Sequence, residues 1–472
     1  MSVVAIRHKT LYGLGQFAWA SKDVAFHYFL FFFYSQYLGL SASLAGLAAL
    51  LALVADAVSD PIIGQISDNF HQGKWGRRHP FMIGAIIPYA LALIALFNPP
   101  DGLSEAALFG WFLGFAILVR TLLTFFTVPH MALGAELSTG YEERTTIATY
   151  RNFIGYVGGL LIQVAAWFLI IPVATAAGDA AAGYANVGYF AAAIAVVGMT
   201  AAILGTRSRI PHLEKTSTEQ QARPGYYAFT DILSILRLHS GRILFFGTLL
   251  MVARAGIANT MLIHINKLHY GFSDLQIGIF MLAVFLALVP SAWLAGHVTR
   301  KREKRDAAVL FILLEAIVGP IPVLAHLYGL LPSAGSMTLL LIVCGFVAIQ
   351  QSFHIAFLHV GAGMLPDIVD EGETKTGMRQ EGIYNSAMMF TQKVTFGVGA
   401  FVAGLAVDFA GVEGITDKAD VTFEMASRLA WVYGAGAALL TLAAAFIFTR
   451  YRLDRKRHAE IRLELEGEHG QA

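Results

Sequence analysis

The sequence predicts an all-α membrane protein whose twelve transmembrane helices form two pseudo-symmetric six-helix bundles. Of the 472 residues, 56% are hydrophobic and only 14% are charged, a balance foreign to an ordinary soluble domain. Apolar runs of about twenty residues or more, long enough to cross a bilayer, recur along the chain. One long polar segment, at about 207–240, divides these runs into two equal sets.

The twelve expected spans follow one another through short connections, except at the central segment. The first span is long and carries polar residues inside it, and the third is short. In chain order the spans are Leu11–Leu38, Leu44–Ser67, Phe81–Phe97, Ala106–Leu133, Ile147–Val173, Asn186–Thr206, Gly241–Ile265, Leu275–Thr299, Asp306–Tyr328, Met337–Met364, Ile383–Phe409 and Phe423–Phe448.

The distribution of positive charge predicts the topology. Nearly all lysines and arginines outside the spans lie in the termini and in the even-to-odd connections, whereas the opposite connections hold only Lys267 and Lys418. Because cytoplasmic loops carry the excess of positive charge, both termini and the central segment are expected in the cytoplasm. The first apolar run is too long for the h-region of a cleavable signal peptide, so we expect a multi-pass plasma-membrane protein of the bacterial inner-membrane type.

This topology gives four regions. Residues 1–206 form an N-terminal six-helix bundle, and residues 207–240 a cytoplasmic loop with an amphipathic segment, Phe229–Leu238. Residues 241–450 form the C-terminal bundle, and residues 451–472 a charged cytoplasmic tail. The charged stretches after spans four and ten resemble each other, from Leu137 to Arg151 and from Asp367 to Tyr384, which favours two parallel repeats about an axis normal to the membrane.

Composition and motifs exclude several function classes. A formal net charge of +1 does not suit a nucleic-acid binder, and the single cysteine, Cys344, excludes a disulfide framework and a thiolate metal cluster. The sequence contains no HExxH or GxSxG motif, which argues against an intramembrane hydrolase. A simple channel would not need charges buried at matching places in two repeats.

Two aspartates in the second span are the strongest functional signal. Asp56 and Asp60 are four residues apart, so they share one helix face. Pro61 has no backbone N–H, so the Ala57 carbonyl oxygen lacks its usual helical hydrogen bond. One ionised carboxylate at this depth costs about 2.5–3.5 kcal/mol on insertion scales. The pattern indicates a pocket for a small cation or a proton. The alternative is a structural pair neutralised by Lys or Arg from neighbouring helices.

The run DAVSDPIIG from Asp56 to Gly64, followed by Asp68 and by GRRHP at 76–80, resembles the signature of the glycoside–pentoside–hexuronide cation symporters. These form the melibiose-permease branch of the major facilitator superfamily, whose fold the resemblance therefore implies. Supporting motifs span nearly the whole chain. They are Lys22-Asp23, Val128-Pro129, Tyr150-Arg151, the acidic run from Asp367 to Gly377 and Gln392-Lys393.

The resemblance implies roles for particular residues. Asp56 and Asp60 match the paired carboxylates that bind the coupling cation, as ligands of Na⁺ if sodium is coupled, and Thr124 matches a hydroxyl beside them. Ser59 stands where sodium-selective relatives have Asn, which leaves Na⁺ and H⁺ both open. Residues that match substrate-cavity positions are Lys22, Asp23, Arg151 and Lys393. We expect cation-coupled symport of a sugar-like solute by a monomer in the lipid bilayer, with no cofactor.

Other positions depart from the melibiose permease. Thr127 and Met131 replace an Asp and a Trp that clasp and stack on the galactosyl ring, and Leu30 replaces an aromatic residue of the first helix. These changes argue against a galactoside. The sequence also resembles sodium-dependent lysophospholipid transporters, particularly at 126–129 and 143–151, so a cation-coupled transporter of such amphiphiles is the alternative function.

Several further charged residues have two interpretations. Asp68 with Arg77 or Arg78 is expected to form a cytoplasmic lock that gates transport. Arg254 is expected to pair with a carboxylate such as Glu315 across a helix interface, whereas Arg120 suits a structural or a cavity-lining role about equally. The histidines within spans, His27, His130, His354 and His359, are expected to bond backbone carbonyls. His130 is the exception with a possible role in transport, because it follows the Val128-Pro129 step of the cavity-lining helix.

Overall fold

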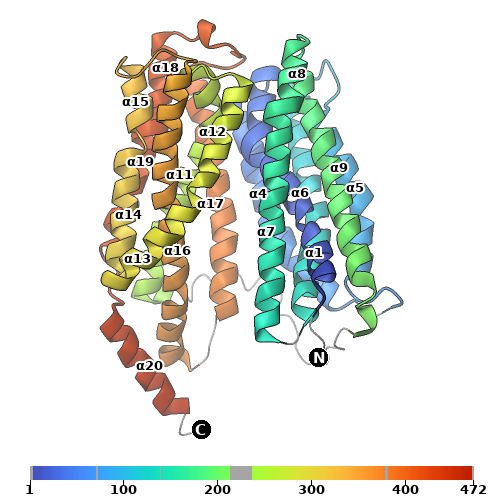
Figure 1. The fold of residues 1–472 in the computed structure, drawn as a ribbon, viewed down its shortest axis with the longest axis vertical. Helices are drawn as coiled ribbons and strands as arrows, with labels where there is room; N and C mark the ends of the chain where they lie inside the picture. Colours follow the sequence, from blue (N-terminus) through green and yellow to red (C-terminus); the bar gives the residue numbers. More distant parts are fainter. Residues whose placement is uncertain (1–3, 71–72, 139, 213–235, 378–380, 470–472) are drawn as a thin grey trace. The chain divides into compact units, whose positions relative to one another are not determined.

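The computed structural model describes residues 4–70, 73–138, 140–212, 236–377 and 381–469, and these residues are helical apart from turns, loops and one isolated bridge (Figure 1). Within them, eleven helical stretches are long and apolar enough to cross a membrane. The stretches coincide with the second to the twelfth expected spans. The fold class expected from the sequence is therefore confirmed. The described helices divide into two compact units, residues 1–225 and 226–472.

The first unit contains helices α1 to α9 and a short final turn, η4. Helix α4 packs against α6, α5 packs against α6 and α9, and α7 packs against α1 and α2. The elements are α1 (Ile6–Leu14), α2 (Gln16–Val24), η1 (Ala25–Phe29), α3 (Leu30–Phe32), η2 (Phe33–Tyr37), α4 (Ala42–Asp68), α5 (His79–Phe97), α6 (Glu105–Glu136), α7 (Tyr141–Ala165), η3 (Ala166–Ile170), α8 (Ile171–Ala176), α9 (Ala180–Arg207) and η4 (Ile210–His212).

The first expected span, Leu11–Leu38, is helical but is not one regular helix. Residues 6–37 form three α-helical pieces and two π-helical segments, with a turn at Gly15 between the first two pieces. A Cβ at Gly15 would lie 2.6 Å from Nε2 of His130 and 2.9 Å from Cβ of Ala202, so the turn permits close helix packing. π-Segments often occur at functional sites, and η1 begins two residues after Asp23.

The second unit is built on the packing of α11 against α17 and α19, and of α16 against α12, α13 and α14. Its elements are α11 (His239–His264), η6 (Ile265–His269), α12 (Asp274–Leu286), α13 (Leu288–Lys301), α14 (Lys304–Val318), α15 (Ile321–Leu327), α16 (Met337–Thr376), α17 (Glu381–Ala410), η7 (Lys418–Asp420), α18 (Phe423–Ala430), η8 (Trp431–Gly436), α19 (Ala437–Phe448) and α20 (Arg455–His469).

The tenth span is longer than expected. The charged stretch that begins at Asp367 was expected to follow the span, but its first part instead extends α16 to Thr376. An i,i+4 pair between Lys375 and Glu371 (3.1 Å) supports this extension, and Asp367 pairs with Lys304 of α14 (2.6 Å). The helix ends at Gly377, whose φ of 67° lies in the left-handed region.

The charged tail contains a helix that the sequence analysis did not anticipate. Helix α20 packs on α16, burying Ile461 and Leu465, and its His458 lies 3.1 Å from Asp370. An apolar residue every fourth position is a short signal that is easily lost within a strongly charged segment. Of the expected amphipathic segment Phe229–Leu238, residues 229–235 lie outside the described residues.

Candidate functional site

Helices α4 and α6 bring together the polar residues that were expected to bind the cation. Asp56, Ser59 and Asp60 lie on α4, and Thr124 lies on α6, whose packing against α4 is extensive. The Thr124 hydroxyl lies 2.9 Å from Oδ1 of Asp60 and 3.1 Å from the Arg120 carbonyl oxygen. Ser59 donates a hydrogen bond to the Asp56 carbonyl oxygen (3.1 Å). Carboxylate and hydroxyl oxygens from two helices therefore meet at one place.

Arg120 provides a positive charge within this group. Its Nη1 lies 3.5 Å from Oδ2 of Asp56, and its guanidinium lies 4.2 Å from the ring centre of Phe26 in η1. Arg120 is 3% exposed and Asp56 is 8% exposed, so the pair is buried. Of the two interpretations of Arg120, the structure favours pairing with a carboxylate. Arg120 and Asp56 are 64 residues apart in the sequence, so their pairing could not be predicted from local spacing.

The first helical run places a second polar group close to Arg120. Nζ of Lys22 lies 3.8 Å from Oδ1 of Asp23, and Nδ1 of His27 lies 3.7 Å from the other oxygen of the same carboxylate. The i,i+4 spacing of Asp23 and His27 indicates this contact, although the sequence analysis expected His27 to bond a backbone carbonyl. Arg120 interacts electrostatically with Asp56, Asp23 and Asp60.

The remaining expected substrate residues are more dispersed. Thr127 donates to the Leu123 carbonyl oxygen of its own helix (3.1 Å), and Met131 is 50% exposed. Nη2 of Arg151 lies 3.2 Å from Oδ1 of Asn152 on α7. Lys393 lies half-buried on α17 in the second unit. Their substrate roles stay predictions.

The expected pair of Asp68 with an arginine is present, and it includes a further carboxylate. Nη1 of Arg78 contacts Oδ1 of Asp68, and its Nη2 lies 3.0 Å from Oε1 of Glu136 at the end of α6. Nη2 of Arg77 lies 2.6 Å from the same Glu136 oxygen. Glu136 was missed by the sequence analysis, although an acidic residue at the end of span four, on the side of the basic loop, is a usable signal.

We expect Asp68→Asn to slow uptake and to shift the protein towards the inward-open state, with a smaller effect on substrate affinity. Glu136→Gln should slow uptake more strongly, because Glu136 accepts from both arginines. Initial uptake rates and distance measurements between spin labels check this, with Asp101→Asn in an exposed turn as the matched control. Wild-type rates and conformer populations in both variants would contradict a gating role.

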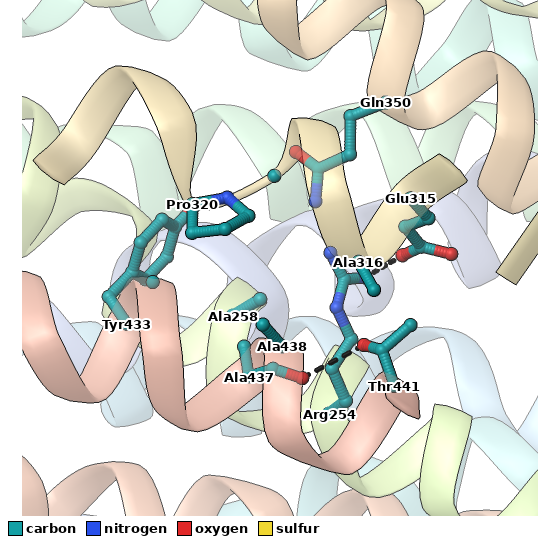
Figure 2. Close-up of a pocket in the computed structure, with 12 residues that line it drawn as sticks. Arg254, Ala258, Glu315, Ala316, Pro320, Gln350, Tyr433, Ala437, Ala438 and Thr441 are labelled. Atoms are coloured by element: carbon teal, nitrogen blue, oxygen red, sulfur yellow. Dashed lines mark hydrogen bonds and ion pairs between the residues drawn. The ribbon is translucent and has the colours of Figure 1, made fainter. Parts of the chain in front are cut away.

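The second unit contains a buried ion pair between different helices. Nη1 of Arg254 on α11 lies 2.9 Å from Oε1 of Glu315 on α14. Figure 2 shows this pair beside a small cavity that Gln350, Tyr433 and Thr441 also line. Glu315 is 1% exposed. The partner that the sequence suggested for Arg254 is confirmed.

The histidines divide between two kinds of partner. Nδ1 of His354 on α16 lies 3.1 Å and 3.2 Å from the two carboxylate oxygens of Glu315, so the expectation of a backbone carbonyl was wrong for this residue. The Glu315 carboxylate lies within reach of His354 because α14 packs directly against α16. Nε2 of His130, in contrast, lies 2.9 Å from the Tyr12 carbonyl oxygen, the structural arrangement.

Arg254→Ala should lower the free energy of unfolding by about 3–5 kcal/mol, because it leaves Glu315 buried with a lost cationic partner. The double variant Arg254→Met/Glu315→Leu should recover most of the loss, since it removes both charges. Thermal unfolding of the purified proteins in detergent measures both effects. Equal unfolding temperatures for wild type and Arg254→Ala would show that the pair contributes no stability.

The fold and these buried charge pairs define a multi-pass membrane transporter rather than an enzyme. The chain belongs to the family described as "MFS/sugar transport protein", which it matches over residues 11–455. The resemblance to glycoside–pentoside–hexuronide symporters is thereby confirmed.

Two curated relatives and one solved structure illustrate the similarity. The isoprimeverose transporter of Lactiplantibacillus pentosus is 26% identical, with 98% of this chain and 91% of the relative aligned. The putative glycoside/cation symporter YagG of Escherichia coli is 24% identical, with 86% and 83% aligned. The inward-open structure of the xylose transporter XylE from E. coli has a TM-score of 0.60 and 16% identity, covering 96% of this chain and 97% of that chain, and shows the shared fold.

Proposed function

We propose that the protein is a symporter that uses a Na⁺ or H⁺ gradient to move a glycoside across the bacterial plasma membrane by alternating access. The observation that carries this proposal is the hydrogen bond of Thr124 on α6 to Asp60 on α4, one helical turn from Asp56 on the same face. Ionisable groups within membrane spans are rare and are functional by default. The names of the relatives, an isoprimeverose transporter and a putative glycoside/cation symporter, support the substrate class and the coupling.

The proposed roles divide between two parts of the first unit. Asp56 and Asp60, with Thr124 and Ser59 beside them, hold the coupling cation. Asp23 accepts hydrogen bonds from sugar hydroxyls, which two carboxylate oxygens can do together, and Lys22 and Arg120 offset its charge. We further propose that Lys393 and Arg151 contact the substrate, that the termini face the cytoplasm, and that the monomer is the working unit.

Solute accumulation in proteoliposomes tests the proposal. Purified protein is reconstituted, and uptake of labelled glycosides is followed with an imposed Na⁺ gradient, an imposed proton gradient or neither. Accumulation above equilibrium with either gradient is expected for at least one glycoside. Accumulation of a lysophospholipid alone would favour the alternative function, and gradient-independent equilibration of every solute would refute coupling.

Asp60→Asn should abolish gradient-driven accumulation while leaving exchange of bound solute measurable, because the site loses one of its two negative charges. Asp56→Asn should have the same effect on accumulation. Asp60→Asn is the cleaner test, since Asp56→Asn also removes the partner of Arg120. Retention of wild-type gradient dependence in both variants would show that these carboxylates do not hold the coupling ion.

Lys393→Ala should lose most of the mutual enhancement between cation and substrate binding, since bound ion and bound sugar raise each other's affinity reciprocally. Substrate titrations with and without saturating cation measure the affinity ratio. Arg254→Ala serves as the comparison, because its partner is Glu315 and its expected effect is on stability. Loss of the ratio in Arg254→Ala but not in Lys393→Ala would reverse the assignment.

A further inference from the structure

The proposed cation site at Asp56 and Asp60 already contains a positively charged side chain, Arg120. Arg120 lies one helical turn before Thr124 on α6, and its guanidinium approaches Asp56 at 3.5 Å. The same group attracts Asp23 and Asp60. Asp23, Asp56 and Asp60 carry three negative charges. The positive charges of Lys22 and Arg120 reduce the formal charge of this group to −1. A site with Asp56 and Asp60 alone would present two.

The contacts of Arg120 hold it in place by charge more than by hydrogen bonds. Its distance of 3.5 Å to Asp56 is at the long end for a hydrogen bond, and among the described residues no acceptor is present for its buried Nε. The ring of Phe26, 4.2 Å away, provides a π-face for the guanidinium. Arg254 provides the contrast, because its 2.9 Å approach to Glu315 is short. Arg120 is therefore more weakly held than Arg254.

A second cation bound between Asp56 and Asp60 would lie close to this guanidinium. Like charges a few ångströms apart repel far more strongly in a buried site than in water. An inorganic cation that uses Asp56 must therefore bind against the charge of Arg120, which is also attracted to the carboxylate of Asp23.

We infer that Arg120 is a specificity-determining residue: it acts as a tethered cation on Asp56 that weakens the binding of Na⁺. This inference rests on the proposed function, because it assumes that Asp56 and Asp60 hold the coupling ion. It follows that removal of the charge at position 120 strengthens sodium binding, whereas a change that keeps the charge does not.

Sodium binding to the purified protein tests the inference without any sugar. Thermal unfolding is measured over a NaCl series, with choline chloride keeping the ionic strength constant, because a ligand of the folded state raises the unfolding temperature. We expect Arg120→Gln to lower the apparent Kd for Na⁺ at least tenfold, which corresponds to about 1.4 kcal/mol. Arg120→Lys keeps the charge and should bind Na⁺ about as weakly as wild type. The same sodium affinity in wild type and Arg120→Gln, including no binding by either, would overturn the inference.

A second variant keeps the test open if Arg120→Gln does not fold. Phe26→Leu removes the aromatic face beneath the guanidinium but leaves all charges in place, so sodium affinity should rise by a smaller factor. Phe31→Leu, at a buried phenylalanine of the same helical run, controls for lost packing. Unchanged sodium affinity in Phe26→Leu would contradict the inference.

The outcome is separable from that of the proposed function. Failure of every glycoside to accumulate would refute glycoside symport but would not alter the sodium titrations. Accumulation driven by Na⁺ with unchanged sodium affinity in Arg120→Gln would leave symport standing and refute the role of Arg120. In uptake assays, Arg120→Gln should lower the Na⁺ concentration for half-maximal uptake more than it changes the KM for sugar, a split that a purely structural role would not produce.

Discussion

Every charge placed inside a membrane-spanning helix needs a partner, because lipid offers neither water nor counter-ions. The contact of Arg120 with Asp56 meets this requirement in the first unit, and the contact of Arg254 with Glu315 meets it in the second. The positions of α4 against α6, and of α11 near α14, are therefore constrained by electrostatics as well as by apolar packing. Moving either helix away would leave an uncompensated charge in a medium of low dielectric constant.

The two pairs differ in how completely their charges are satisfied. Glu315 receives Arg254 and His354 together, at 2.9 Å and 3.1 Å, and is almost fully buried. Asp56 has a longer contact with Arg120, and the neighbouring Asp60 contacts the hydroxyl of Thr124. A closely matched network suits a structural role, since it has little to gain from a further ligand. A network with one long contact and an excess of carboxylate charge retains affinity for a small cation, which is what a transport site requires.

The fold followed from the sequence wherever a span was uniformly apolar. Eleven of the expected spans are helical stretches, and all but the tenth have about the expected extent, because length and hydropathy largely decide whether a segment can cross a bilayer. The first span differs because Gly15 and the polar residues Lys22 and Asp23 interrupt its apolar character. The extension of α16 through Pro366 could not be derived from the same measure. Within that extension Asp367 pairs with a lysine from α14, a contact between distant parts of the chain.

The candidate site shows the same division between local and distant information. The spacing of Asp56 and Asp60 and the pairing of Asp68 with Arg78 involve residues close in sequence, and both were predictable. Glu136 and Arg120 come from α6 and reach residues about 60 positions away, so only the packing of α4 and α5 on α6 reveals their partners.

That packing changes the meaning of the aspartate pair. On the sequence alone, the carboxylates could either bind a cation or be neutralised by a basic residue of another helix, and these were alternatives. In the structure a basic residue contacts Asp56 while Asp60 lies beside Thr124, so a basic partner for one carboxylate does not exclude a role of the pair in binding a cation. Asp56 can be neutralised by Arg120 in one state and bind a cation in another. The contact between them is long and incompletely hydrogen-bonded, so a bound ion can replace it. On the proposed role of Arg120, the strength of that contact sets how readily the ion binds, so the sodium affinity of the site depends on α6 as well as on the aspartates.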